Sequence, residues 1–131
     1  MRYVITEKTV LSVIDHPFIV KLFRSFQNAG KLFLIMEYWP GGDLSFHLKR
    51  AGRFTESCAR LYLCQIILAI EHLHEKDIIY RDLKPANIVI DKDGNAKLAD
   101  FGLSKVGIKG HTKTKSYWGS IAYLPPEILM K

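Results

Sequence analysis

The strongest structural signal in this sequence is a helical repeat of apolar residues between Thr55 and Glu75. Thr55 is a residue type that caps helix N-termini. The apolar side chains recur at steps of three and four residues, as on one face of an α-helix, at Ala59, Tyr62, Leu63, Ile66, Ile70 and Leu73. The pattern predicts a long helix whose apolar face is packed in the core of the chain.

Shorter elements are predicted on either side of this helix. Before it, the patterns favour a helix over residues 4–14, an antiparallel hairpin of residues 18–26 and 31–38, and a short helix over residues 44–50 capped by Asp43. After it, segments 78–80, 88–90 and 96–99 are short and apolar, and the last two favour strands joined by a turn. Residues 102–120 contain glycine, four lysines and no acid. They predict a mobile surface loop.

Composition limits the class of protein. With 131 residues, of which 48% are hydrophobic and 24% charged, the chain can form one packed domain and is not a disordered or fibrous segment. The net charge of +6 permits nucleic acid, membranes or phosphate as partners without selecting among them. No apolar run approaches the ~20 residues of a membrane span. Cys58 and Cys64 are too far apart on the predicted helix for a disulfide. We therefore expect a cytoplasmic protein, with the nucleus left open.

Two polar runs in the second half of the chain interrupt apolar structure and carry candidate catalytic residues. The first contains Asp82, which could accept a proton, Lys84, a cation for developing negative charge, and Asn87, a neutral oxygen ligand. The second begins with Asp100, an anionic oxygen ligand. Asn87 and Asp100 suit Mg²⁺, which takes few protein ligands and fills its shell with water and phosphate oxygens. The combination indicates phosphoryl transfer, although Asp82 or Asp100 taken singly could be a turn-capping aspartate.

Two further patterns are weaker candidates for metal sites. His72 and His74 lie two residues apart on the predicted helix and face different directions, so they cannot share a metal ion as an i, i+4 pair could. We expect His74 to be packed or hydrogen-bonded. The run from Asp91 to Asn95 resembles a calcium loop only in part, because its glycine stands at position four rather than six. We expect a hairpin turn there.

In order and spacing, the polar runs resemble the catalytic loop and the metal-binding motif of eukaryotic protein kinases. The matching sequences are Asp82-Leu-Lys-Pro-Ala-Asn87, Asp100-Phe-Gly102 and Pro126-Glu127. The resemblance runs from Thr6 to Lys131 and implies the α+β, two-lobe kinase fold in an incomplete form. It divides the chain into a small-lobe remnant (1–36), a hinge (37–42) and the first half of the mainly helical large lobe, through the activation loop (43–131).

The resemblance implies a role for each matching residue. Asp82 would accept the proton of the substrate hydroxyl, and Lys84 would steady the transferring phosphate. Asn87 and Asp100 would hold Mg²⁺. The remaining matches would form the ATP site: Glu37 and Trp39 in the hinge, Met36 gating the pocket behind it, Asp43 near the ribose and Val89 under the base. An apolar stack between the lobes would consist of Leu11, Leu22, Tyr80 and Phe101.

Other matches concern subtype and regulation. With Lys84 at this position, the catalytic loop resembles that of Ser/Thr kinases rather than that of tyrosine kinases. Tyr80 stands where His is commoner, and in this the chain resembles the AGC group. Glu7 resembles the small-lobe acid that pairs with a strand lysine, although it could simply be solvated. Ser116 occupies the activation-loop position that an upstream kinase would phosphorylate. A phosphate there could pair with Arg81 and Lys105.

The resemblance implies transfer of the γ-phosphate of ATP, with Mg²⁺, to Ser or Thr of protein substrates, without a nucleic-acid partner or a membrane span. No glycine-rich loop and no strand lysine precede Glu7, so we expect the isolated chain to have negligible activity. The alternative is a pseudokinase-like fragment that acts by binding. A basic nucleic-acid-binding module is a third possibility, which binding independent of salt concentration would dismiss.

Overall fold

The computed structural model describes residues 2–108 and 120–130. In this part of the chain, every paired strand belongs to a two-stranded antiparallel sheet: β1 with β2, β3 with β6, and β4 with β5. The α+β class predicted from the sequence is confirmed. The elements in chain order are α1 (Arg2–Leu11), β1 (Leu22–Asn28), β2 (Lys31–Met36), α2 (Leu44–Ala51), α3 (Glu56–Glu75), β3 (Ile78–Ile79), the 3₁₀ turn η1 (Pro85–Asn87), β4 (Ile88–Ile90), β5 (Ala96–Leu98), β6 (Lys105–Val106), the 3₁₀ turn η2 (Ile121–Tyr123) and α4 (Pro126–Leu129).

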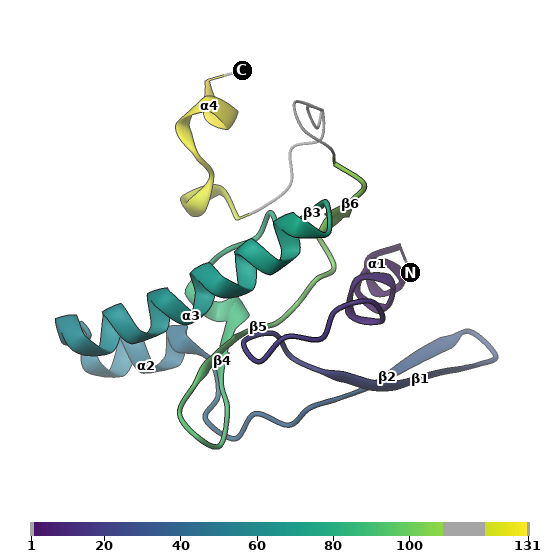
Figure 1. Cartoon of the computed structure of the whole chain (residues 1–131), viewed down its shortest axis with the longest axis horizontal. Helices are drawn as coiled ribbons and strands as arrows, with labels where there is room; N and C mark the ends of the chain where they lie inside the picture. The colour runs from purple at the N-terminus through teal and green to yellow at the C-terminus, as the bar shows by residue number, and fades with distance from the viewer. Residues whose placement is uncertain (1, 109–119, 131) are drawn as a thin grey trace.

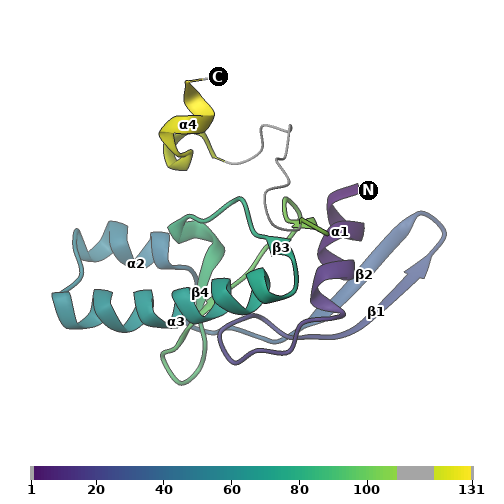
Figure 2. The same cartoon turned by 45° about the horizontal axis from the view of Figure 1, so that its top comes forward.

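The elements are arranged in two groups joined by the segment that follows β2. Helix α1 and the β1–β2 hairpin lie at one end, and α2 and α3 lie side by side at the other, with the β4–β5 hairpin between the two groups (Figures 1 and 2). The chain passes from the first group to the second between Met36 and Leu44. None of the helices in the described ranges has the length and apolar character needed to cross a membrane.

Local sequence explains where the two main helices begin. The hydroxyl of Thr55 accepts the Cys58 backbone N–H at 3.3 Å and caps α3. The carboxylate of Asp43 accepts the Phe46 backbone N–H at 2.9 Å and caps α2. Both caps satisfy amide groups that have no partner inside the helix, and both were predicted.

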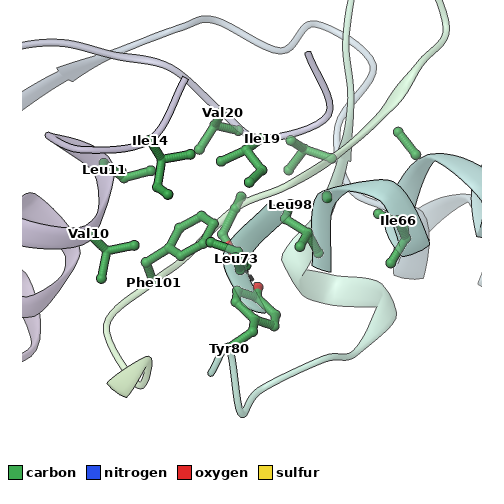
Figure 3. Packing of buried hydrophobic residues seen from close by; sticks show 14 of the residues in the cluster. Val10, Leu11, Ile14, Ile19, Val20, Ile66, Leu73, Tyr80, Leu98 and Phe101 are labelled. Atoms are coloured by element: carbon green, nitrogen blue, oxygen red, sulfur yellow. Dashed lines mark hydrogen bonds between the residues drawn. The ribbon is translucent and has the colours of Figure 1, made fainter. Parts of the chain in front are cut away.

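The core forms where α1, α3 and β5 meet. Figure 3 shows Phe101 between Val10 and Leu11 of α1 on one side and Leu73 of α3 on the other. Phe101 and Leu73 are fully buried. The Tyr80 ring meets Phe101 edge-on with centroids 5.2 Å apart, and its hydroxyl donates to the Ala99 carbonyl. The four residues expected to stack between the lobes all belong to this cluster, with Leu22 at its margin.

The outer face of α3 differs from the prediction. Ile66, Ala69 and Leu73 are buried as expected, but Leu63, predicted to be in the core, is 60% exposed. Leu63 instead lines an open pocket between α2 and α3, together with Leu44, Leu48 and Tyr62, and so remains in contact with solvent.

Element boundaries were predicted less well than element types. The helix expected over residues 4–14 ends at Leu11, and the strand expected from Phe18 begins at Leu22. Phe18 and Val20 pair with β5 instead: the Phe18 carbonyl accepts the Leu98 N–H at 2.9 Å, and the Val20 N–H donates to the Leu98 carbonyl at 3.0 Å. This crossing buries Ile19 and Val20 and attaches the β1–β2 hairpin to the β4–β5 hairpin.

The segment expected to be a surface loop from Gly102 onward contains a strand. Lys105 and Val106 form β6, which pairs with Ile79 and Ile78 of β3. A two-residue strand has no periodicity of its own, so nothing local in the sequence indicates it. The pairing anchors the start of this segment beside the end of α3.

Candidate functional site

The segment between β3 and β4, residues 80–87, carries the predicted catalytic residues and is held at its start by two side chains. Tyr80 is buried beside Phe101. Arg81 has a positive φ of 71° and donates from Nε to the Leu103 carbonyl at 2.7 Å. A second bond from Arg81 reaches the Ser104 carbonyl at 3.3 Å. The backbone before Asp82 is therefore fixed against the segment that follows Asp100.

Asp82 lies at the centre of a compact polar cluster. Its Oδ2 accepts Lys84 Nζ at 2.8 Å and Asn87 Nδ2 at 2.8 Å. Its Oδ1 accepts both the backbone N–H and the hydroxyl of Ser120, each at 3.1 Å. Lys84 Nζ also donates to Ser120 Oγ at 2.8 Å. The structure thus brings the two predicted catalytic residues together and adds a serine hydroxyl between them.

The ionisation of Asp82 follows from these contacts. The residue is 6% exposed, and burial by itself would raise its pKa. Hydrogen bonds from Lys84, Asn87 and Ser120 outweigh burial, so the pKa of Asp82 lies below its ordinary value. Asp82 is therefore a carboxylate at neutral pH, able to accept a hydrogen bond from a hydroxyl group.

The two predicted metal ligands lie next to each other across a backbone pairing. The Ala99 N–H donates to the Asn87 carbonyl at 2.9 Å, which places Asp100, the following residue, beside Asn87. The Asn87 amide nitrogen donates to Asp82, so its oxygen is the group left for a cation. Asp100 is exposed and has a positive φ of 54°. One carboxylate and one amide oxygen fit Mg²⁺, which needs few protein ligands.

Besides Met36, which ends β2, four ATP-site residues were predicted, and two of them, Asp43 and Val89, are brought together. They form an isolated antiparallel bridge, and Val89 is 5% exposed. The Asp43 carboxylate is engaged as the α2 cap. Just before it, the Gly41 N–H donates to the Ile90 carbonyl at 3.1 Å, and a Cβ at Gly41 would lie 2.7 Å from the Ile90 Cβ. Glycine is therefore required where the chain passes β4.

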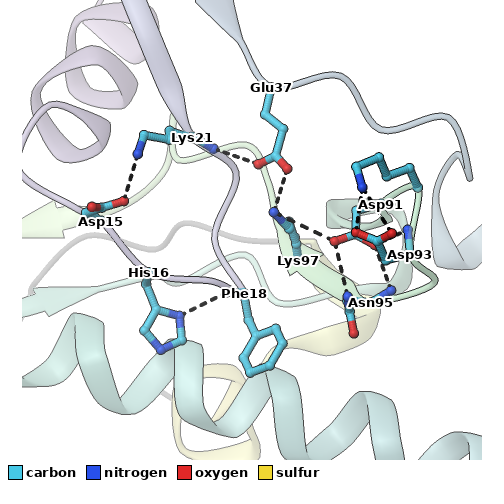
Figure 4. A network of polar contacts seen from close by, with 10 residues as sticks. Asp15, His16, Phe18, Lys21, Glu37, Asp91, Asp93, Asn95 and Lys97 are labelled. Carbon is cyan, nitrogen blue, oxygen red and sulfur yellow. Dashed lines mark hydrogen bonds and ion pairs between the residues drawn. The ribbon is translucent and has the colours of Figure 1, made fainter.

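The other two, Glu37 and Trp39, lie in the connecting segment, and Glu37 joins it to β5. Lys97 Nζ contacts Glu37 Oε1 at 2.6 Å and Asp91 Oδ2 at 3.8 Å (Figure 4). Trp39 is half-buried and packs against the core. Asp91 in turn accepts the N–H groups of Asp93 and Asn95, both at 2.9 Å, which confirms the hairpin turn. The ion pair fixes the side chain of Glu37, and the Glu37 N–H donates to the Lys21 carbonyl at 2.8 Å, so the Glu37 carbonyl is the backbone group that could face a ligand.

Comparison with known proteins decides the family. The model of the protein kinase domain matches residues 1–131. The chain belongs to the protein kinase family. It is 50% identical over 125 residues to ribosomal protein S6 kinase beta of Caenorhabditis elegans, covering 95% of the chain and 23% of that relative. It is 46% identical over 134 residues to the serine/threonine-protein kinase sck1 of Schizosaccharomyces pombe, covering all of the chain and 19% of sck1.

These matches bear out the predicted resemblance to AGC-like Ser/Thr kinases. A third relative, protein kinase 3 of Dictyostelium discoideum, is 47% identical over 95% of the chain and 15% of its own length. The chain therefore spans less than a quarter of the length of these curated relatives. Protein kinases use ATP and Mg²⁺ and act on protein substrates.

Two of the four predicted regulatory residues of this kinase domain line one cavity. Arg81 and Lys105 line a cavity of about 320 Å³ between α1 and the segment after Asp100. Glu7 lies near Asp100 and accepts the Phe101 N–H. Burial, and then the charge of Asp100, raise the pKa of Glu7 above its ordinary value. Ser116 lies outside the described residues.

Sequence reasoning missed Ser120 as a member of the kinase site. Ser120 was included only as the end of a basic loop, yet its hydroxyl and amide both donate to Asp82. It is 38 residues from Asp82 and directly precedes the turn η2. Only the residue type, a hydroxyl near Pro126-Glu127, could have indicated it.

Proposed function

We propose that this chain supplies the catalytic segment of a Ser/Thr protein kinase that transfers the γ-phosphate of ATP to a protein hydroxyl. The observation that carries the proposal is the geometry around Asp82. The Asp82–Lys84 pair holds a serine hydroxyl, with Oγ 3.1 Å from Asp82 Oδ1 and 2.8 Å from Lys84 Nζ. A carboxylate and a cation that bind one hydroxyl in the structure have the chemistry needed to bind the hydroxyl of a substrate.

Each residue has a distinct part in this proposal. Asp82 orients the acceptor hydroxyl and takes its proton as the new P–O bond forms and the bond to the leaving ADP breaks. Lys84 offsets the negative charge of the phosphate. Asn87 and Asp100 would hold Mg²⁺, whose chemistry when bound is to neutralise phosphate charge. The backbone at Glu37 and Trp39, the Asp43 carboxylate and the Val89 side chain would receive the nucleotide.

A segment exchange tests the proposal. The chain replaces the matching 125 residues of the C. elegans S6 kinase beta, with which it is 50% identical. Phosphate transfer from ³²P-labelled ATP to a Ser/Thr peptide is then measured for the chimera and its parent. We expect the chimera to transfer phosphate.

The rival function predicts a different result from the same chimera. A pseudokinase-like segment would give a folded chimera that binds partners and transfers no phosphate, while the parent remains active. Circular dichroism and gel filtration of both proteins separate this result from simple misfolding. A folded, inactive chimera would overturn the proposed kinase function and favour the binding role.

Activation by an upstream kinase at Ser116 is part of the proposal. A phosphate at Ser116 would be drawn to Arg81 and Lys105, which supply positive charge beside α1. We expect Ser116→Ala to lower the activity of the chimera after treatment with an activating kinase, and Thr114→Ala to serve as the neighbouring control. Equal activity of Ser116→Ala and the unchanged chimera would place the switch elsewhere.

A further inference from the structure

Two histidines that the proposed kinase chemistry does not use meet between the two groups of elements. His16 lies in the loop between α1 and β1, and His72 lies on α3. Their rings stack with centroids 4.9 Å apart and 28° between their planes. His72 takes the packed position, whereas His74, which was expected to be packed, is exposed. The stack therefore connects the loop that follows α1 to the longest helix of the chain.

The surroundings of His16 favour its neutral form. Its Nδ1 accepts the Phe18 backbone N–H at 3.2 Å (Figure 4). A neutral imidazole that accepts at Nδ1 carries its proton on Nε2, so a second proton must go to Nδ1 and remove the acceptor of Phe18. Burial, and then the neighbouring His72, lower the pKa of His16 below its ordinary value of 6.5. Charging His16 thus breaks a bond that shapes the loop.

The two ring nitrogens of His72 have different surroundings. Its Nδ1 faces the Glu75 carboxylate at 4.0 Å. Its Nε2 is buried and has no hydrogen-bond partner among the residues that the structure describes. A charge on His16 would therefore lie against a packed ring, and two charged imidazoles in contact would repel each other.

The charged side chains that line the cavity beside His16 already have opposite partners. A cavity of about 350 Å³ beside His16 is lined by Asp15 and Lys21 of the same loop, and by Glu37 and Lys97 from the connecting segment and β5. Lys21 pairs with Asp15 at 3.2 Å and Lys97 with Glu37 at 2.6 Å (Figure 4). On α3, Glu75 is the acid beside His72. Mild acidification therefore acts on this contact through the ring of His16.

We propose that the stacked rings of His16 and His72 form a pH-sensitive contact between the α1–β1 loop and α3, closed while His16 is neutral and opened when acidification charges it. Opening releases from α3 the loop that follows the helix carrying Glu7. The stabilisation from this contact is present above the unfolded-state value of 6.5 and is lost as the pH falls through the lower folded-state pKa of His16. The device does not depend on the proposed phosphate transfer.

Histidine titration in the full chain by NMR tests the proposal. The Cε1–Hε1 resonances of both rings are followed from about pH 8 to about pH 5, where imidazoles titrate, with His16→Asn used only to assign the signal. We expect His16 to titrate below 6.5 and the ring-to-ring nuclear Overhauser effect to vanish over the same range. Titration of His16 at or above 6.5, or a ring contact that persists at the acid end, would overturn the proposal.

Two variants on the same helix separate the stack from a general effect of histidine. His72→Phe keeps an aromatic ring against His16 and removes its charge, so we expect the midpoint of His16 to move upward and the acid-induced loss in folding constant to shrink. Each unit by which the His16 midpoint lies below its unfolded value corresponds to about a tenfold loss in that constant. His74→Gln, on an exposed residue, should behave like the unchanged chain.

If His74→Gln shifts the His16 midpoint as much as His72→Phe, the pair has no special role and the proposal fails. Should His72→Phe not fold, the titration and the ring contact of the unchanged chain still decide the question.

Discussion

Two carboxylates of the kinase site, Asp82 and Glu7, show opposite electrostatic environments. Asp82 is held by Lys84, Asn87 and Ser120, and its pKa is lowered. Glu7 on α1 is half-buried, faces the charge of Asp100, and its pKa is raised. No ion pair to Glu7 is found within residues 2–108 and 120–130. The described residues therefore provide a cation for the Asp82 carboxylate and none for the Glu7 carboxylate on α1.

The segment around Asp82 is complete within the described residues, whereas the surroundings of Glu7 are not. The catalytic segment obtains its cation and hydrogen-bond donors from residues 84–120. Burial and the charge of Asp100 both disfavour the ionised form of Glu7. A cation from outside the described residues would therefore be stabilised beside it.

Removing the charge of Asp82 should have the largest effect. Asp82→Asn keeps the size of the side chain and removes the proton acceptor, so we expect phosphate transfer by the S6 kinase chimera to fall by about 10²–10⁴-fold. The measurement is the turnover rate with a Ser/Thr peptide. Asp93→Asn, at an exposed turn residue whose carboxylate pairs with Lys92, is the control. A loss below about tenfold would remove Asp82 from the reaction.

The ion pair between Lys97 and Glu37 should rank next. The Lys97 side chain is 12% exposed, so Lys97→Met would leave the carboxylates of Glu37 and Asp91 partly buried without their cation. We expect a loss of about 1–3 kcal/mol in the free energy of unfolding by urea. Lys92→Met, whose side chain is 78% exposed, should leave the midpoint unchanged. Equal midpoints for both variants would mean that the pair does not anchor the segment after β2.

Loss of the Ser120 hydroxyl should have a moderate effect. Ser120→Ala removes one hydrogen bond to Asp82 and one acceptor from Lys84, for which we expect about 1 kcal/mol in unfolding free energy. Because this hydrogen bond is among those that lower the pKa of Asp82, the same variant should raise that pKa, as read from the carboxyl ¹³C shift. An unchanged Asp82 titration would show that the hydroxyl does not reach the carboxylate.

Neutralising Glu7 should have the smallest effect and the opposite sign. A raised folded-state pKa means that the contribution of neutral Glu7 is fully present below 4.5 and is lost as the pH rises through the folded value. Glu7→Gln should therefore leave the chain equally or slightly more stable at neutral pH, and remove this part of the pH dependence. Urea unfolding at several pH values measures it. A clear loss of stability at neutral pH would reveal a stabilising partner of the charge.

Much of the fold could be predicted because the signals are local. The caps at Asp43 and Thr55, the periodicity of α3 and the turn after Asp91 each lie within a few residues of the elements they define. The boundary errors have a common cause. Phe18 and Val20 leave the predicted strand to pair with Leu98, and β6 exists only because β3 is there to pair with it. Both depend on partners distant in the sequence.

The same division explains the site. Asp82, Lys84 and Asn87 are close in sequence, and the structure brings their side chains into contact. Ser120 reaches Asp82 through a return of the chain that no spacing rule encodes. The environment of Glu7, with its like-charge neighbour Asp100, also depends on tertiary packing between α1 and the segment after β5.

The titration of the two carboxylates in one sample tests the central claim most directly. The chain is labelled with ¹³C, and the carboxyl resonances of Asp82 and Glu7 are followed through acidification, with Asp82→Asn and Glu7→Gln assigning the signals. The account predicts that Asp82 titrates below 3.8 and Glu7 above 4.5. Titration of Asp82 at or above the midpoint of Glu7 would contradict it, because the catalytic segment would then lack the cation and donors assigned to it.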